Sequence, residues 1–160
     1  MSEEILSHLD KDGRATMVDV SEKTITKRTA TARSIVSLPD EVLTQLVDGE
    51  LQTKKGSVFQ IAIIAGIMAA KKTGDLIPLC HPLGLDNCNI IINLNENNEV
   101  IIDCTTSITA KTGVEMEALV GATMSALTVY DMCKALSHDI IIKETKLIAK
   151  TGGKRDFKRT

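Results

Sequence analysis

The segment YDMCKA (130–135) places an acid and a base at the end of an apolar stripe on a predicted helix. Residues spaced by three and four lie on one face of a helix, so Asp131 and Lys134 face the same way. Such a pair is commonly an exposed ion pair near a helix end. At the mouth of a cleft, partial desolvation would instead lower the pKa of the lysine, and the two groups could move protons. The stripe consists of Val120, Met124, Leu127, Asp131, Lys134 and His138.

Two acids open the same predicted helix, in the segment KTGVEMEAL (111–119). Carboxylates in a first helical turn are stabilised by the helix dipole, which is one explanation for Glu115 and Glu117. The other is ligand binding, because a carboxylate pairs well with the donor edge of a guanine-like base. Two acids would also suit a divalent ion, with Mg²⁺ as the candidate, if phosphates are present.

Lysines and glycines occur together in two further segments, TKKGS (53–57) and AKTGGKRD (149–156). Glycines let a backbone approach phosphate oxygens, and lysines supply positive charge. Neither segment matches the P-loop pattern, and the chain contains no G-x-G-x-x-G. Together with Arg28, Lys111 and Lys134 they predict a site that collects several negative charges.

A cysteine and a histidine stand side by side between two prolines in LIPLCHPLGL (76–85). A zinc site usually takes four ligands at a recognisable spacing, whereas adjacent Cys80 and His81 diverge on an extended backbone. We therefore expect no metal here. Pro78 and Pro82 instead favour a rigid loop that aims the imidazole in one direction. A buried, hydrogen-bonded structural histidine is the alternative.

The composition indicates an ordinary globular domain. Apolar residues make up 43% of the 160 residues and charged residues 25%, and the net charge of −2 provides no basic field for nucleic acid or an anionic membrane. Only three aromatic residues are present, which disfavours base stacking. No apolar run is long enough to span a membrane, and the polar N-terminus is unlike a secretory signal, so we expect a cytoplasmic protein. The four cysteines form no C-x-x-C pair, and we expect their thiols to be reduced.

Hydrophobic periodicity predicts the order of the elements. Residues 24–38 alternate like a strand, residues 39–49 fit a short helix from Pro39 to Gly49, and residues 56–74 fit an apolar, central helix with Ser57 as its N-cap. A hairpin (87–95 and 100–109), a long helix (115–137) with many small residues, and a strand (138–150) follow.

This order predicts an α+β fold of the ferredoxin-like class, β-α-β-β-α-β with an extra helix. Helices would cover one face of an antiparallel sheet, and the other face would meet water or another subunit. Residues 1–13 read as a flexible arm and residues 14–160 as a single catalytic domain.

Four segments together resemble one family. They are MVDVSEKTITKRTATA (17–32), KKTGDLIPLCHPLGL (71–85), KTGVEMEALVGATMSALTVYDMCKA (111–135) and LIAKTGGKRDF (147–157). They are similar to the cyclic pyranopterin monophosphate synthases of molybdenum-cofactor biosynthesis, the MoaC family, from about residue 13 to 157. The resemblance implies a phosphorus–oxygen lyase that converts 3′,8-cyclo-7,8-dihydro-GTP, made by an upstream radical GTP cyclase, to cyclic pyranopterin monophosphate and diphosphate.

The resemblance also implies a homohexamer, a trimer of dimers with active sites at dimer interfaces. Asp131 would be the catalytic acid/base and Lys134 its partner. Residues that match the family's substrate site are Leu79, Cys80, His81, Glu115, Met116, Glu117, Lys55, Arg28 and Lys150. Ser57 stands where aspartate is usual and Ile63 where arginine is common, and Val120-Gly121 is atypical.

Two readings from other functional classes remain at this point. A nucleotide-sensing module of the same fold would explain the lysines, although it gives no reason for Asp131 and Lys134 to end an apolar stripe. An RNA-binding domain is disfavoured by the missing sheet aromatics and the acidic net charge.

Overall fold

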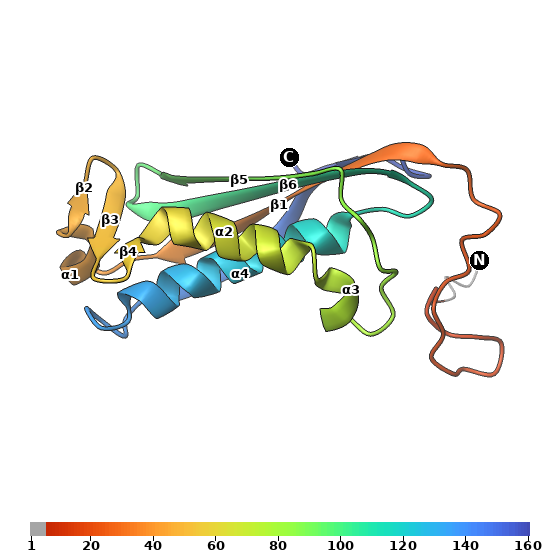
Figure 1. The fold of residues 1–160 in the computed structure, drawn as a ribbon, viewed down its shortest axis with the longest axis horizontal. Helices are drawn as coiled ribbons and strands as arrows, with labels where there is room; N and C mark the ends of the chain where they lie inside the picture. The colour runs from red at the N-terminus through yellow and green to blue at the C-terminus, as the bar shows by residue number, and fades with distance from the viewer. Residues whose placement is uncertain (1–5) are drawn as a thin grey trace.

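The protein, described here from a computed structural model of residues 6–160, is a sheet covered by two helices on one face (Figure 1). The predicted ferredoxin-like arrangement is confirmed. Within the described residues, the main sheet has the order β5-β6-β1-β7-β8, with antiparallel neighbours throughout. Its strands are β1 (Thr26–Ser37), β5 (Asn87–Leu94), β6 (Glu99–Ala110), β7 (Ile141–Thr151) and β8 (Phe157–Lys158), and the covering helices are α2 (Val58–Ala70) and α4 (Glu115–Cys133).

Strand β1 shows why the sheet forms where the alternation predicted it. From Ala30 to Ser37 every second side chain, including Ala30, Ala32 and Val36, is fully buried on the face that packs against α4, and those between them are half-exposed. A period of two puts one set of residues on each face of a strand. The core therefore lies between this face and the two helices.

The two helices approach each other closely because small residues meet at their crossing. A Cβ atom on Gly66 of α2 would lie 2.1 Å from the Ser125 hydroxyl and 2.7 Å from the Gly121 carbonyl of α4. The Ser125 hydroxyl donates to the Ala62 carbonyl across this crossing at 2.9 Å. The close approach expected from the small residues of the long helix is confirmed.

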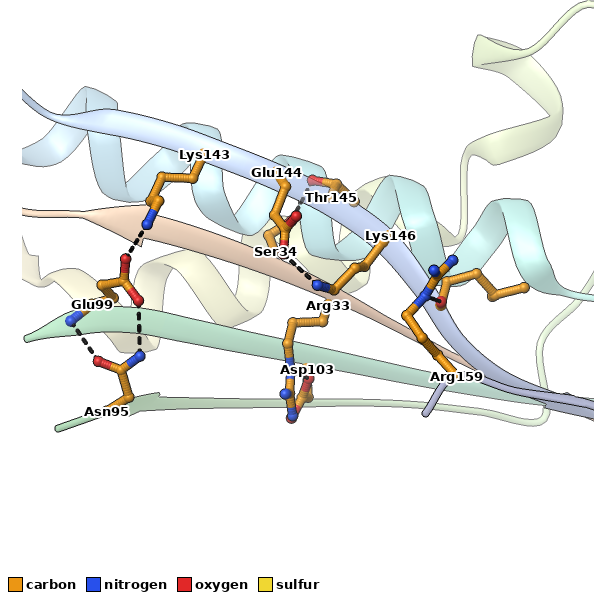
Figure 2. A network of polar contacts seen from close by, with 11 residues as sticks. Arg33, Ser34, Asn95, Glu99, Asp103, Lys143, Glu144, Thr145, Lys146 and Arg159 are labelled. Carbon is orange, nitrogen blue, oxygen red and sulfur yellow. Dashed lines mark hydrogen bonds and ion pairs between the residues drawn. The ribbon is translucent and has the colours of Figure 1, made fainter. Parts of the chain in front are cut away.

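The opposite face of the sheet carries a polar network, shown in Figure 2. Arg33 of β1 donates two hydrogen bonds to Asp103 of β6, at 2.7 and 2.8 Å, and Lys143 of β7 pairs with Glu99 of β6. Neither α2 nor α4 covers this face (Figure 1). The expectation that it meets water or another subunit stays a prediction.

The short helix predicted over residues 39–49 is wrong beyond its first turn. Helix α1 spans only Asp40–Leu43, and β2 (Leu46–Val47) turns back into β3 (Glu50–Thr53). Asp48 and Gly49 between them have positive φ angles of 50° and 77°, the pair of conformations that a tight Asp-Gly hairpin turn requires. This hairpin turn ends the helical pattern.

The apolar helix predicted over 56–74 is also divided. Ser57 occupies the N-cap position of α2, as predicted, but its side chain makes no capping hydrogen bond. Strand β4 (Gly56–Ser57) pairs with β3, α2 follows, and Thr73–Leu76 form the separate turn α3. The Glu50 carboxylate accepts the Phe59 amide at 2.9 Å and the Ser57 hydroxyl at 2.5 Å. A carboxylate from β3 thus replaces the expected serine cap.

The predicted N-terminal arm lies partly outside the described residues, since its first five positions are not included. From residue 6 on, an antiparallel bridge joins Leu9 to Ala15, and the Asp10 carboxylate accepts the amides of Asp12 and Arg14 within that turn. The boundary at residue 13 stays a prediction. Across residues 6–160, no helix combines the length and the apolar character that crossing a membrane demands.

Candidate functional site

A cavity of about 420 Å³ opens at the N-terminal end of α4, where the proline-bracketed loop meets the segment before β1. We call it the main cavity. Eight of the eleven residues expected at the site line it, and they come from β1, β7, α4 and the loop. These eight are Arg28, Leu79, Cys80, His81, Glu115, Met116, Glu117 and Lys150.

The loop of residues 77–86 presents Cys80 and His81 to the main cavity, and it is neither strand nor helix. It packs tightly on α3, since a Cβ atom on Gly74 would lie 3.0 Å from the Cα of Pro82. The His81 ring is half-buried and its Nε2 lies 2.8 Å from the Val18 carbonyl. His81 therefore combines features of both sequence-based readings. Its ring lines the main cavity, and it also makes a hydrogen bond to the backbone at Val18.

One wall of the main cavity is positively charged and internally paired. Lys150 donates to Glu115 at 3.0 Å, and the Arg28 Nη2 donates to the Lys111 carbonyl at 3.2 Å. The Arg28 Nε is buried, and no residue within 6–160 accepts a hydrogen bond from it. An incoming anion cannot reach this buried nitrogen, but the guanidinium still places a positive charge in the wall of the cavity, which favours an anion there.

Glu117 is the most buried acid of the main cavity, with an exposure of 4%. Burial, and then the charge of Glu115, raises the pKa of this carboxyl above its usual value. Burial and the charge of Glu117 likewise raise the pKa of the Cys80 thiol. A hydrogen bond from its own backbone amide to the Glu117 carboxyl opposes the rise in the pKa of Glu117. The carboxyl lines the main cavity, and its remaining lone pairs can accept hydrogen bonds from a ligand.

A second cavity, of about 550 Å³, lies on the other side of Arg28, Glu115 and Lys150. Its wall includes the glycines of the predicted lysine-glycine segment 149–156, together with Lys154. A Cβ atom on Gly153 would lie 3.0 Å from Nη1 of Arg28, so this backbone does approach the cationic group closely.

Lys23 lines both cavities and was missed by the sequence reasoning. It belongs to no regular element, and its neighbours in sequence carry no motif apart from the family resemblance. Only the folded chain places it on the walls of the same two cavities as Arg28.

The predicted catalytic pair lies at the opposite end of α4. Lys134 donates to the Asp131 carboxylate at 2.6 Å, and the two side chains are about half exposed, at 50% and 53%. They border a surface hollow of about 480 Å³. The apolar stripe that precedes them lines the same hollow through Met124 and Leu127, as the helical spacing predicted.

In one copy of the chain the pair is the exposed ion pair of the first reading, and the pKa of Lys134 is raised, not lowered as the cleft-mouth reading requires. The hydrogen bond to Asp131 and its charge raise the pKa of Lys134, because desolvation is slight at an exposed position. Lys134, and then the charge of Lys55, lower the pKa of Asp131. Lys55, in the turn between β3 and β4, therefore acts on this pair and does not line the main cavity.

The helix itself separates the two groups of residues. Glu115 begins α4 and Cys133 ends it, and at 1.5 Å per residue this helix is about 28 Å long. Figure 1 shows its two ends at opposite sides of the molecule, one toward α3 and the other toward β3. One copy of the chain thus brings eight of the eleven expected residues together and leaves Asp131, Lys134 and Lys55 apart from them.

The chemistry of each group is clear from its charges. The main cavity offers a guanidinium and an ammonium for anions, and a desolvated carboxyl for a donor-bearing ring. The exposed pair offers a carboxylate that accepts protons and an ammonium that donates them. No group of three or more His, Cys, Asp and Glu side chains in residues 6–160 is arranged to hold a metal ion.

Comparison with known proteins gives consistent matches over nearly the whole chain. A protein from Xanthomonas axonopodis pv. citri named cyclic pyranopterin monophosphate synthase is 52% identical, over 95% of this chain and 92% of that protein. One of the same name from Thermoanaerobacter pseudethanolicus is 47% identical, over 93% and 94%. Molybdenum cofactor biosynthesis protein 1 of Dictyostelium discoideum is 52% identical over 92% of this chain, which spans 26% of that longer protein. The model of the MoaC family matches residues 17–153, and the chain belongs to that family.

Proposed function

We propose that this chain is a cyclic pyranopterin monophosphate synthase. It would convert 3′,8-cyclo-7,8-dihydro-GTP to cyclic pyranopterin monophosphate with release of diphosphate, an early step of molybdenum cofactor biosynthesis. The upstream radical GTP cyclase would supply the substrate. The observation that carries the proposal is the pairing of a cationic, acid-containing cavity with the exposed Asp131–Lys134 couple in a chain whose relatives bear that name.

The cationic wall suits the first chemical requirement, which is phosphoryl transfer. A sugar hydroxyl attacks the α-phosphorus, the bond to the diphosphate breaks, and diphosphate leaves with its negative charge. Arg28 and Lys150 border both cavities, and in this proposal they would neutralise charge on the transferred group and on the leaving group. We propose no resident metal; Mg²⁺ would enter with the phosphates of the substrate.

The second requirement is proton movement during ring opening and pterin closure. In the free protein Asp131 is ionised and Lys134 is charged, because each stabilises the other's ionic form. Asp131 can therefore accept a proton and Lys134 can donate one. We propose that Asp131 is the catalytic acid/base and Lys134 its partner, with Lys55 adding positive charge beside them.

The remaining residues of the main cavity would hold the base and the sugar. Glu117 lines the main cavity with a buried carboxyl, which would accept hydrogen bonds from the donor edge of the aminopyrimidine ring. Leu79, Cys80 and Met116 would contact the apolar faces of the substrate, and His81 and Glu115 would complete the wall.

The separation within one copy supports a site shared by two copies. Asp131 and the main cavity lie at opposite ends of α4, too far apart to act on the same atoms. We propose a homohexamer, a trimer of dimers, in which the pair of one copy completes the main cavity of another.

We propose a cytoplasmic location, because the reducing cytoplasm suits the four free thiols.

The test is incubation of the purified protein with enzymatically prepared 3′,8-cyclo-7,8-dihydro-GTP. We expect mass spectrometry to detect cyclic pyranopterin monophosphate and an equal amount of diphosphate. Tight binding of a GTP analogue without any conversion of the cyclised substrate would contradict the proposal and point to a nucleotide-sensing module.

A further inference from the structure

Residues 18–23 form a wall of the main cavity, and two side chains from distant parts of the chain hold them there. His81 Nε2 lies 2.8 Å from the Val18 carbonyl. The Lys111 ammonium donates to the Ser21 carbonyl at 2.7 Å. These contacts join the segment to the proline-bracketed loop and to the end of β6, sixty-three and ninety residues away in sequence.

The segment has a conformation of its own but few contacts that would fix its position. The Asp19 carboxylate accepts the Ser21 amide at 2.8 Å, and the Lys23 amide donates to the Val20 carbonyl at 3.0 Å, so the turn is formed locally. Residues 21–25 are exposed, and the segment belongs to no strand or helix. A turn with so little buried surface opens easily unless it is anchored.

The position of this segment determines the position of Lys23, one of the cationic residues of the site. Val18 and Val20 line the main cavity, and Lys23 borders both cavities, as Arg28 does. The anchor is also linked to that arginine, because the Lys111 carbonyl accepts the bond from its Nη2. Lys111 therefore contacts the segment through its side chain and Arg28 through its backbone.

We propose that His81 and Lys111 are positioning residues, which anchor the segment of residues 18–23 as a wall of the main cavity and thereby hold Lys23 at the boundary of the two cavities. Neither residue needs to touch the reacting atoms for this role. His81 acts through the Val18 carbonyl, which accepts a hydrogen bond from its Nε2. Lys111 acts through the Ser21 carbonyl, which accepts a hydrogen bond from its ammonium. The consequence for catalysis rests on the proposed function, whereas the anchoring itself does not.

Anchoring can be measured without substrate by hydrogen–deuterium exchange of a peptide that covers residues 17–24. We expect His81→Ala and Lys111→Ala each to raise the exchange rate of this peptide on the order of tenfold, because each variant loses one hydrogen bond that anchors the segment. Exchange in α4 should stay unchanged, which shows that the fold is intact.

Conservative and remote variants sharpen this measurement. His81→Gln keeps an N–H donor at nearly the same reach and should restore slow exchange, whereas Lys72→Met removes an exposed lysine outside both cavities and should have no effect. Unchanged exchange of residues 17–24 in both His81→Ala and Lys111→Ala would overturn the proposal, whatever the protein's activity.

Steady-state kinetics then separates positioning from direct catalysis. We expect His81→Ala to raise KM on the order of tenfold and to leave kcat within a few-fold, because the wall is lost but not a reacting group. Lys23→Met should raise KM similarly, and combining it with His81→Ala should add little, since both changes remove the same held cation. A large fall in kcat for His81→Ala with normal exchange would show direct catalysis and overturn the positioning role. Absence of turnover in the unmodified protein would refute only the proposed function.

Discussion

Glu117 and Asp131 lie on the same helix, fourteen positions apart, which separates them by about 21 Å along its axis. The first is buried at the N-terminal end beside the main cavity, and the second is exposed at the C-terminal end beside Lys134. A rigid helix cannot bring these two carboxyls to one substrate. Their joint action therefore requires two copies of the chain, and each end of α4 would serve a different site.

Removing either member of the proposed catalytic pair, Asp131 or Lys134, should greatly reduce turnover without unfolding the protein. Asp131→Ala and Lys134→Ala are expected to lower kcat by about two to four orders of magnitude, the usual contribution of general acid–base groups. Both side chains are exposed, so thermal unfolding should shift little. Turnover of the cyclised substrate by Asp131→Ala within a few-fold of the unmodified protein would refute the assigned role.

Glu117→Gln should stabilise the free protein while it weakens turnover. Burial raises the pKa of Glu117 above the ordinary value of 4.5, so the folded state holds this proton more tightly than the unfolded state does. The unmodified protein therefore loses stability as the pH rises from 4.5 through the raised pKa, and a neutral glutamine does not. The advantage of the variant in urea unfolding should be absent near pH 4 and grow to a plateau above the raised pKa.

Glu115→Gln is the matched control for that experiment. Glu115 forms an ion pair with Lys150, so the loss of its charge removes a favourable contact. It does not remove a large desolvation cost of the kind that the buried Glu117 carries. Its stability should be equal to or lower than that of the unmodified protein at neutral pH. A gain for both variants would contradict the desolvation account of Glu117.

Gly152→Ala should destabilise the loop after β7 and disturb the second cavity. Gly152 has a φ angle of +86°, and a Cβ atom there would lie 1.9 Å from the Lys27 carbonyl. The backbone strain and the clash together are expected to cost about 3 kcal/mol of unfolding free energy. Gly84→Ala, with no atom within 4 Å of its added Cβ, should stay within about 0.5 kcal/mol in the same denaturation experiment.

The sequence predicted the main sheet and its two covering helices because periodicity reports directly on burial. The alternation along β1 and the small residues of α4 both appear in the structure as expected. Local competition explains the errors. Asp48 and Gly49 form a hairpin turn where a helix was expected. The preference of these two residues for positive φ angles outweighs the weak helical pattern around them.

The same limitation concealed part of the site. The cap of α2 comes from Glu50, which reaches the Phe59 amide from another element, and no spacing rule predicts such a contact. Lys23 escaped notice for a related reason, since its position depends on anchors at His81 and Lys111. The separation of Lys55 and Asp131 from the main cavity also depends on how the helix lies in the fold, which the motifs alone do not show.

Glu50→Ala tests the unexpected cap. Its carboxylate accepts the amides of Leu51 and Phe59 and the Ser57 hydroxyl, so its loss should lower the free energy of unfolding by about 1–2 kcal/mol. Ser57→Ala removes only one of these contacts and should cost less. The reverse order in chemical denaturation would mean that the Ser57 hydroxyl stabilises this helix end more than the Glu50 carboxylate does.

Complementation between two inactive variants tests the shared site most directly. Glu117→Ala damages the main cavity and Asp131→Ala damages the pair, and each alone is expected to lose at least about a hundredfold in turnover. When the two are co-expressed and mix at random, about one quarter of the sites combine an intact cavity from one copy with an intact pair from another. We predict that the mixture regains up to about that fraction of normal pterin formation. Activity no higher than that of the separate variants would contradict a site built from two copies.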